Sequence, residues 1–184
     1  MGKKLKVILF LSFFSWILSD IKAQDTLATF ADLVPFVTTP WEVIEEMLDM
    51  AEVNSNDYII DLGSGDGRIP ILAAKKFGTK GLGIEIDKDL VQEAFDLANK
   101  EGVGHLVDFK QGDLFELDFS KASVLTLYLF PDINLKLRPK IREMPSGTRV
   151  ISHRFDMGDW EPHETRTIEL ADGKKHKIFL WIVP

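Results

Sequence analysis

Short apolar runs alternate along this chain with stretches in which apolar residues repeat every three or four positions. The short runs are typical of buried strands, and the longer repeats place apolar side chains on one face of a helix. The pattern predicts strands over residues 58–62, 81–86, 106–110, 122–130 and 149–154, and helices over residues 41–52, 68–77, 88–101 and 131–143. Strands that alternate with helices in this way are expected to form a parallel sheet.

The last part of the chain departs from this alternation. Residues 165–170 and 177–183 are strand-like runs on either side of Asp172-Gly173, a turn signal, and they predict an antiparallel hairpin. Only residues 155–164 join the expected fifth and sixth strands, so the helix between strands 5 and 6 is expected to be missing. The predicted fold class is therefore α/β, a mostly parallel seven-stranded sheet with a C-terminal antiparallel hairpin.

Residues 1–23 have a different character from the rest of the chain. Three lysines precede an unbroken apolar run, and the small residue Ala23 precedes a polar start. This pattern predicts a secretory signal peptide cut after Ala23, and hence export to the periplasm or envelope. The alternatives are a retained anchor, which would associate with a membrane through residues 5–18 and leave the folded domain facing the cytoplasm, and a buried core helix.

Beyond this segment we expect a lead-in over residues 24–40 and one domain over residues 41–184. Residues 1–23 hold four lysines and one aspartate, so without them the formal net charge of −7 becomes −10. A chain this acidic is poorly suited to binding phosphate backbones and better suited to a cationic or neutral substrate, so no nucleic-acid partner is expected. The chain has no cysteine, which rules out thiolate metal sites.

A glycine-rich loop connects the first expected strand to the next helix. Gly63, Gly65 and Gly67 allow the backbone to turn sharply and to approach a ligand closely. A dinucleotide fingerprint starting at Gly63 would need its third glycine where Arg68 stands. Asp61 at the end of the strand would repel a pyrophosphate but attract the ammonium and sulfonium groups of S-adenosylmethionine (SAM).

Two further acids follow the next two expected strands. Glu85 can accept hydrogen bonds from ribose hydroxyls, and Asp113 can accept one from an adenine amino group, while Ile86 and Leu114 can sandwich the ring. Each acid alone could instead cap a helix, and the glycine loop alone could be structural or bind NAD or another nucleotide. Three acids at three successive strand ends favour a SAM site.

Six segments of the chain resemble a known family. They are Asp-Leu-Gly-Ser-Gly-Asp-Gly-Arg (61–68), Gly-Ile-Glu-Ile-Asp (83–87), Gln-Gly-Asp-Leu-Phe (111–115), Thr-Leu-Tyr-Leu-Phe-Pro (126–131), Leu-Arg-Pro-Lys (137–140) and His-Arg-Phe-Asp-Met-Gly-Asp-Trp (153–160). From about residue 35 onward the chain resembles small prokaryotic relatives of the mitochondrial protein-lysine methyltransferases that act on the ATP synthase c-ring protein and on adenine nucleotide translocase. The resemblance implies a Rossmann-like class I fold, SAM as the methyl donor and a protein lysine ε-amino group as the acceptor.

The resemblance also implies that Thr39 and Pro40 help to form the cofactor cleft, whereas Thr38 stands where relatives often carry proline. Thr39 is expected to cap the first helix with its hydroxyl, with Pro40 at the first helical position. The expected cofactor-binding residues are Thr39, Pro40, Asp61, Gly63, Ser64, Gly65, Gly67, Glu85, Ile86, Asp113 and Leu114.

The expected catalytic residues are Tyr128, Phe130 and Asp132, at the end of the fourth strand. The two aromatic faces can hold an ammonium group by cation–π attraction, and Asp132 or Glu116 can assist its deprotonation. Tyr128 and Phe130 can equally be core residues. We expect a monomeric protein-lysine methyltransferase; the alternatives are a small-molecule methyltransferase and a non-catalytic, exported SAM-binding domain.

Two histidines and a tryptophan leave open interpretations. His153 and His163 have no second ligand at helical or hairpin spacing, which favours ordinary strand or loop histidines over a metal ligand or a base, and no metal site is expected. Trp160 either lines the entrance to the substrate site or replaces the packing of the missing helix.

Overall fold

The computed structural model describes residues 37–184. The predicted signal peptide or anchor over residues 1–23, and the lead-in up to residue 36, lie outside the described residues. Within residues 37–184, no helix is both long and apolar enough to cross a membrane.

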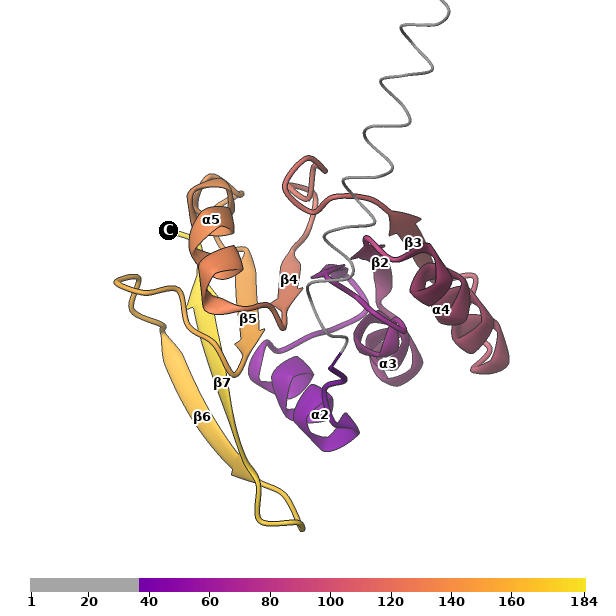
Figure 1. The fold of residues 1–184 in the computed structure, drawn as a ribbon, viewed down its shortest axis with the longest axis horizontal. Coiled ribbons are helices and arrows are strands. Elements are labelled where there is room, and N and C mark those ends of the chain that lie inside the picture. The colour runs from indigo at the N-terminus through magenta and orange to yellow at the C-terminus, as the bar shows by residue number, and fades with distance from the viewer. Residues whose placement is uncertain (1–36) are drawn as a thin grey trace, which may run out of the picture. The chain divides into compact units, whose positions relative to one another are not determined.

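Helices and strands follow one another along the chain nearly as the apolar pattern predicts (Figure 1). The elements are α2 (Trp41–Met50), β1 (Tyr58–Leu62), α3 (Arg68–Phe77), β2 (Lys80–Glu85), α4 (Lys88–Lys100), β3 (Val107–Gln111), β4 (Val124–Leu127), α5 (Pro131–Arg142), β5 (Arg149–His153), β6 (Glu164–Glu169) and β7 (Lys175–Ile182). As expected, the described chain forms no helix between β5 and β6.

The seven strands form one sheet in the order β3-β2-β1-β4-β5-β7-β6. Strands β1 to β5 are parallel to their neighbours, whereas β7 runs antiparallel to both β5 and β6. The predicted fold class is therefore confirmed. The strand order reverses direction between β1 and β4, and such a switch point is where open α/β sheets bind ligands, at the carboxyl ends of their strands.

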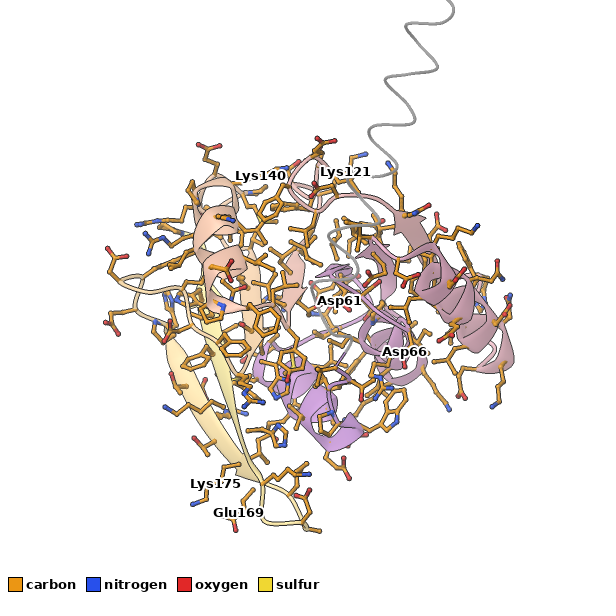
Figure 2. The ribbon with its side chains drawn as sticks, viewed as in Figure 1. Asp61, Asp66, Lys121, Lys140, Glu169 and Lys175 are labelled. Atoms are coloured by element: carbon orange, nitrogen blue, oxygen red, sulfur yellow. The ribbon has the colours of Figure 1, made fainter. Side chains whose placement is uncertain are left out.

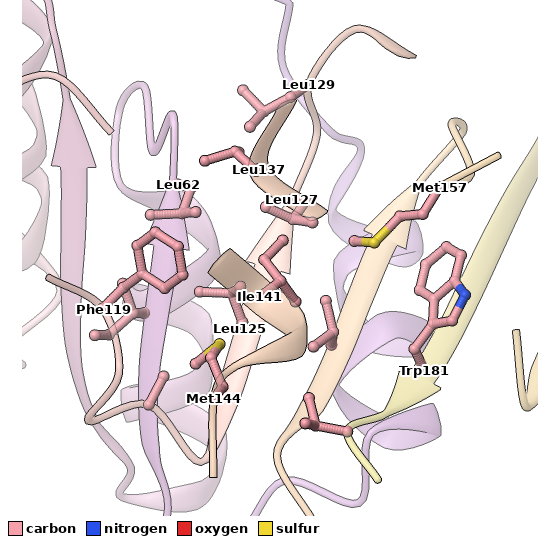
Figure 3. Close-up of a cluster of buried hydrophobic side chains, with 14 of the residues drawn as sticks. Leu62, Phe119, Leu125, Leu127, Leu129, Leu137, Ile141, Met144, Met157 and Trp181 are labelled. Carbon is pink, nitrogen blue, oxygen red and sulfur yellow. The ribbon is translucent and has the colours of Figure 1, made fainter. Parts of the chain in front are cut away.

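Helices cover both faces of the sheet because successive strand residues point to opposite faces. Helices α2, α3 and α4 contact one another in series, and α2 and α3 pack on the face that carries Ile59, Val124 and Ile151. Helix α5 packs on the opposite face. That side of the core is a cluster of buried side chains that includes Leu62, Phe119, Leu125, Leu127, Leu129, Leu137, Ile141, Met144, Met157 and Trp181 (Figure 3).

Strand β4 ends earlier than predicted. The apolar run predicts a strand as far as residue 130, but the strand ends at Leu127 and Phe130 caps helix α5. Leu129 leaves the sheet to pack beneath the glycine loop, where its Cδ2 lies 2.7 Å from the position that a Cβ on Gly63 would take. An unbroken apolar run cannot by itself distinguish a strand from a buried turn.

A polar network joins three strands at the opposite, amino-terminal edge of the sheet. The Asp57 carboxylate forms an ion pair with Arg149 and accepts a hydrogen bond of 2.7 Å from the Ser123 hydroxyl. That hydroxyl in turn accepts a hydrogen bond of 2.9 Å from the Tyr58 amide. Because Asp57 is buried and remote from the carboxyl ends of the parallel strands, we assign this network to stability rather than to the site.

Candidate active site

The carboxyl ends of the parallel strands place the expected site residues along one edge of the sheet. In spatial order from β3 to β5, this edge carries Asp113, Glu85, the loop that starts at Gly63, Tyr128 and His153. The acids therefore lie on the β1–β3 side of the edge, and the aromatic residues on the β4–β5 side. The residues expected to bind the donor and those expected to meet the acceptor thus lie on different parts of one edge.

The glycine loop has a backbone that only glycine adopts easily. Gly63, Gly65 and Gly67 have φ angles of 72°, 53° and 76°, in the left-handed region. The amides of Gly63 and Ser64 both donate to the Ile84 carbonyl, at 2.8 and 3.0 Å, which anchors the loop to β2. The loop is thus a tight turn anchored to β2, and core side chains, Leu129 at Gly63 and Phe109 at Gly67, leave no room for a side chain there.

Glu85 stabilises this loop. One carboxylate oxygen accepts a hydrogen bond from the Gly65 amide at 2.8 Å, and the other accepts from the amides of Ile86 and Asp87 at 2.7 and 3.1 Å. A carboxylate has about four acceptor positions, so this geometry leaves capacity for about one further donor. Glu85 as a ribose-binding residue stays a prediction, and a second ribose hydroxyl would have to displace an existing bond.

Asp61 is buried beneath the loop (Figure 2) and accepts a hydrogen bond of 2.6 Å from the Thr126 hydroxyl. Burial raises the pKa of this carboxyl to about 7; the Thr126 hydrogen bond opposes the shift, and the negative charges of Glu85 and Asp66 add to it. An ionised Asp61 is therefore costly in the ligand-free protein, and a bound cation would offset that cost.

The loop and its surroundings fit SAM. The Ser64 hydroxyl is buried without a hydrogen-bond partner among residues 37–184, and buried polar groups normally have one. Asp61 offers a carboxylate for a cationic group. Asp113 is half-buried and accepts a hydrogen bond of 2.8 Å from the Phe115 amide. Ile86, which follows Glu85, and Leu114, which follows Asp113, are also half-buried. Their contacts with the adenosine part stay predictions.

Sequence reasoning gave no role to Arg68, which ties the lead-in to the glycine loop. Its guanidinium forms an ion pair with Asp66 at 2.6 Å, donates to the Thr39 carbonyl at 3.1 Å and lies 5.1 Å from the centre of the Trp41 ring. The hydroxyl cap predicted for Thr39 is wrong: α2 begins at Trp41, Pro40 is its N-cap, and no side chain caps it. The Thr39 hydroxyl instead lies 3.2 Å from Nδ1 of His153.

Four aromatic side chains gather at the ends of β4 and β5. The ring centre of Tyr128 lies 4.2 Å from that of His153 and 6.3 Å from that of Phe155, and the ring centres of Phe130 and Phe155 are 6.0 Å apart. Phe130 is 39% exposed, and Tyr128 and Phe155 are half-buried. The sequence pattern did not indicate Phe155 as a site residue because it lies beyond the end of β5. Only the turn at Arg154, with φ of 72°, brings its ring toward those of Tyr128 and Phe130.

His153 has a histidine neighbour that sequence spacing did not reveal. Its Nε2 lies 2.9 Å from Nδ1 of His176, which comes from β7. Burial, with smaller contributions from His176 and Arg154, lowers the pKa of His153 to about 3, so the ring is neutral. His163 is exposed and accepts a hydrogen bond of 3.2 Å from the Ile182 amide.

The remaining candidates lie at the margin of the site or outside it. Asp132, in the first turn of α5, and Glu116 are both exposed. Trp160 packs on the hairpin: its ring centre lies 6.0 Å from that of Trp181, and its carbonyl accepts a hydrogen bond of 2.7 Å from Nε1 of that residue. The packing interpretation of Trp160 therefore agrees with the structure. Within residues 37–184, no group of three or more His, Cys, Asp or Glu side chains could hold a metal ion.

The sheet order and the rigid glycine loop above a buried acid define a SAM-dependent methyltransferase. Comparison with known proteins agrees, and the chain belongs to the family described as the ANTKMT methyltransferase domain, whose model matches residues 61–164. A protein-lysine N-methyltransferase from Saccharolobus islandicus is 40% identical over 153 residues, which cover 82% of this chain and 94% of that protein.

Two other relatives extend the comparison. The adenine nucleotide translocase lysine N-methyltransferase from Mus musculus is 32% identical over 70% of this chain, which spans only 56% of the mouse protein. A crystal structure from Salinibacter ruber, described as an RNA methyltransferase in complex with S-adenosylhomocysteine, is 51% identical with a TM-score of 0.75, covering 80% of this chain and 94% of that chain. The relatives are thus all described as methyltransferases, while their names differ in the acceptor.

Proposed function

We propose that this protein transfers a methyl group from SAM to the ε-amino group of a lysine in a protein. The observation that carries the proposal is the group of aromatic rings formed by Tyr128, Phe130 and Phe155 at the ends of β4 and β5, with Phe130 39% exposed, since aromatic faces bind ammonium groups. The name and near full-length coverage of the relative from Saccharolobus islandicus support the same acceptor.

The chain's own residues have two tasks in this reaction. When bound, SAM supplies a methyl group attached to a positively charged sulfur. Asp61 and Ser64 would hold its amino-acid part, and Glu85 and Asp113 its adenosine part. The aromatic residues would orient the lysine nitrogen toward the methyl group, and orientation is the main contribution that such a displacement needs.

The acceptor nitrogen has to be neutral when it attacks. The proton that the ammonium group loses would pass to the Asp132 carboxylate, which is exposed and can release it to water. The new N–C bond replaces the C–S bond, so one proton is released for each methyl group transferred. Because Asp132 is exposed, its replacement by Asn should lower the rate by less than about 100-fold, the lower end of general-base effects.

RNA is the acceptor class that one relative's description supports. The formal charge of −10 beyond residue 23 opposes it, since phosphate backbones require a basic surface. A transfer assay separates the two: the purified full-length chain is incubated with methyl-labelled SAM and either envelope proteins or total RNA. We expect label in methylated lysine after acid hydrolysis of the protein. Label in RNA alone, or no transfer despite SAM binding, would overturn the proposal.

Phe130 and its conservative replacement provide a matched test of the aromatic site. Phe130→Leu should raise the KM for the protein acceptor about 2- to 5-fold, the range for an exposed cation–π contact of about 0.5–1 kcal/mol, whereas Phe130→Tyr should keep it. Affinity for S-adenosylhomocysteine should be unchanged in both variants. Equal effects of Leu and Tyr would mean that the ring's charge distribution is not used.

We propose further that residues 1–23 bring the protein to the cell envelope. The lysines and the apolar run support this, and retention of the segment as an anchor would leave the domain in the cytoplasm, where SAM is made. Cell fractionation with N-terminal sequencing tests both forms. A terminus at Gln24 in the periplasm supports export, an intact Met1 in the membrane fraction supports the anchor, and an intact Met1 in the soluble cytoplasm overturns the proposal.

A further inference from the structure

One buried residue, Thr39, holds residues 37–40, the described part of the lead-in, against the folded domain. Val37 and Trp41 are 55% and 44% exposed, whereas Thr39 between them is 4% exposed. Thr39 uses both its polar ends for contacts with distant parts of the chain: its carbonyl accepts from Arg68 at 3.1 Å, and its hydroxyl lies 3.2 Å from Nδ1 of His153. One buried residue thus links the donor half of the site to the acceptor half.

Arg68 and His153, the two partners of Thr39, each form a further polar contact with another residue. On the donor side, Arg68 forms hydrogen bonds with both oxygens of Asp66, at 2.6 and 2.9 Å, within the glycine loop. On the acceptor side, Nε2 of His153 lies 2.9 Å from Nδ1 of His176. A continuous polar chain therefore runs from β7 through Thr39 to the glycine loop.

The neutral state of His153 gives this chain a defined hydrogen-bond pattern. A neutral imidazole has one donor and one acceptor nitrogen, and both ring nitrogens of His153 have partners. If the Thr39 hydroxyl donates to Nδ1, then Nε2 donates to His176; if Nδ1 donates to Thr39, then His176 donates to Nε2. In either case, the direction of the hydrogen bond between His153 and Thr39 determines the direction of the hydrogen bond between His153 and His176. The Tyr128 ring, 4.2 Å from that of His153 between ring centres, packs against the same residue.

We infer that His153 and His176 are positioning residues that, through Thr39, hold the lead-in segment against the glycine loop and so align the SAM site with the acceptor site. They do not need to touch either reactant. Loss of the His153–Thr39 bond should let residues 37–40 move away from Arg68 and weaken binding of the donor. The inference requires SAM as the donor and holds for any acceptor.

The test measures the affinity of the full-length protein for S-adenosylhomocysteine by calorimetry. Thr39→Val removes the hydroxyl but keeps the carbonyl that Arg68 uses, and His153→Phe removes the nitrogens but keeps an aromatic ring beside Tyr128. Each variant should bind about 2- to 12-fold more weakly, the effect of one hydrogen bond of about 0.5–1.5 kcal/mol. The double variant should lose no more than the weaker-binding single variant, because both remove the same bond.

His163→Gln is the matched control, since His163 is an exposed histidine of the same C-terminal region, and its affinity should not change. His176→Phe should weaken binding in the same direction as His153→Phe but less. Additive losses from Thr39→Val and His153→Phe, or a lower Tm with unchanged affinity, would overturn the inference. If the unmodified protein itself does not bind S-adenosylhomocysteine, the donor assignment fails instead, so the two failures are distinguishable.

Discussion

Replacing Asp61 with Asn should make the ligand-free protein more stable and its donor binding weaker. The carboxylate is buried next to Glu85 and Asp66, which raises its pKa from 3.8 to about 7. Asn has the same shape, can still accept the Thr126 hydrogen bond and carries no charge. The substitution therefore removes a negative charge that destabilises the folded protein and that stabilises the bound cationic ligand.

The magnitude follows from linkage between protonation and folding. With the folded pKa of Asp61 raised above its unfolded value, its favourable contribution is present at low pH and is lost as the pH rises through 7. One pKa unit corresponds to about 1.4 kcal/mol, so the raised pKa of Asp61 lowers the free energy of unfolding by about 4 kcal/mol at pH 8 and by under 1 kcal/mol at pH 4. Asp61→Asn should raise the free energy of unfolding by up to that amount at pH 8, and hardly at all at pH 4.

Ligand binding should change in the opposite direction. A hydrogen bond to a charged group contributes about 1.5–3 kcal/mol, so Asp61→Asn should weaken S-adenosylhomocysteine binding about 10- to 150-fold. In the unmodified protein, the affinity should rise about tenfold between pH 6 and pH 8 as Asp61 ionises, and the variant should lack this rise. Urea unfolding and calorimetry at each pH measure both effects. A variant that is less stable at pH 8, or that keeps the pH dependence, would refute the role of Asp61.

Three further expectations concern stability, each measured by urea unfolding. Gly67→Ala should lower the free energy of unfolding by about 2–4 kcal/mol because its methyl would lie 2.5 Å from a Phe109 ring carbon. Gly102→Ala is the control: its φ is also 76°, but nothing lies within 4 Å, so it should lower the free energy of unfolding by about 1–2 kcal/mol. Equal losses of stability in the two variants would contradict the packing argument. Asp57→Ala breaks a buried ion pair and should cost about 2–3 kcal/mol without changing S-adenosylhomocysteine affinity. Since the pKa of His153 is lowered to about 3, its contribution is present above pH 6.5 and lost on acidification; from pH 7.5 to 5.5 the protein should lose about 1.4 kcal/mol that His153→Phe does not lose.

The donor half of the site could be predicted from the sequence because its residues lie close together in the chain. Asp61 and the three glycines fall within one strand-loop-helix unit, and their spacing fixes the backbone geometry that a ligand meets. Strand ends then bring Glu85 and Asp113 to the same edge. Local pattern and parallel topology together determine these positions.

Contacts between distant segments could not be predicted in this way. Thr39 and His153 are separated by 114 positions, and no local pattern indicates that the Thr39 hydroxyl turns to a histidine instead of capping its own helix. His176 meets His153 only because the register pairs His153 with Ile178, two residues farther along β7. Because β6 lies between β5 and β7 in the chain, their register is not set by one turn, and a spacing rule within one segment does not reveal such a pair.

The short link between β5 and β6 helps to explain why so few residues form the acceptor half. Instead of a helix over the sheet edge, the link buries Met157 in the core beside Trp181 and is held by Arg138, which donates to the Met157 carbonyl at 2.7 Å. The link between β5 and β6 therefore contributes side chains to the core. The edge beside the glycine loop is left to Tyr128 and Phe130, with Phe155 returned to them by the turn at Arg154. Substitutions of Phe130, whose ring neighbours that of Phe155 and not that of His153, should therefore change acceptor preference without disturbing the donor site.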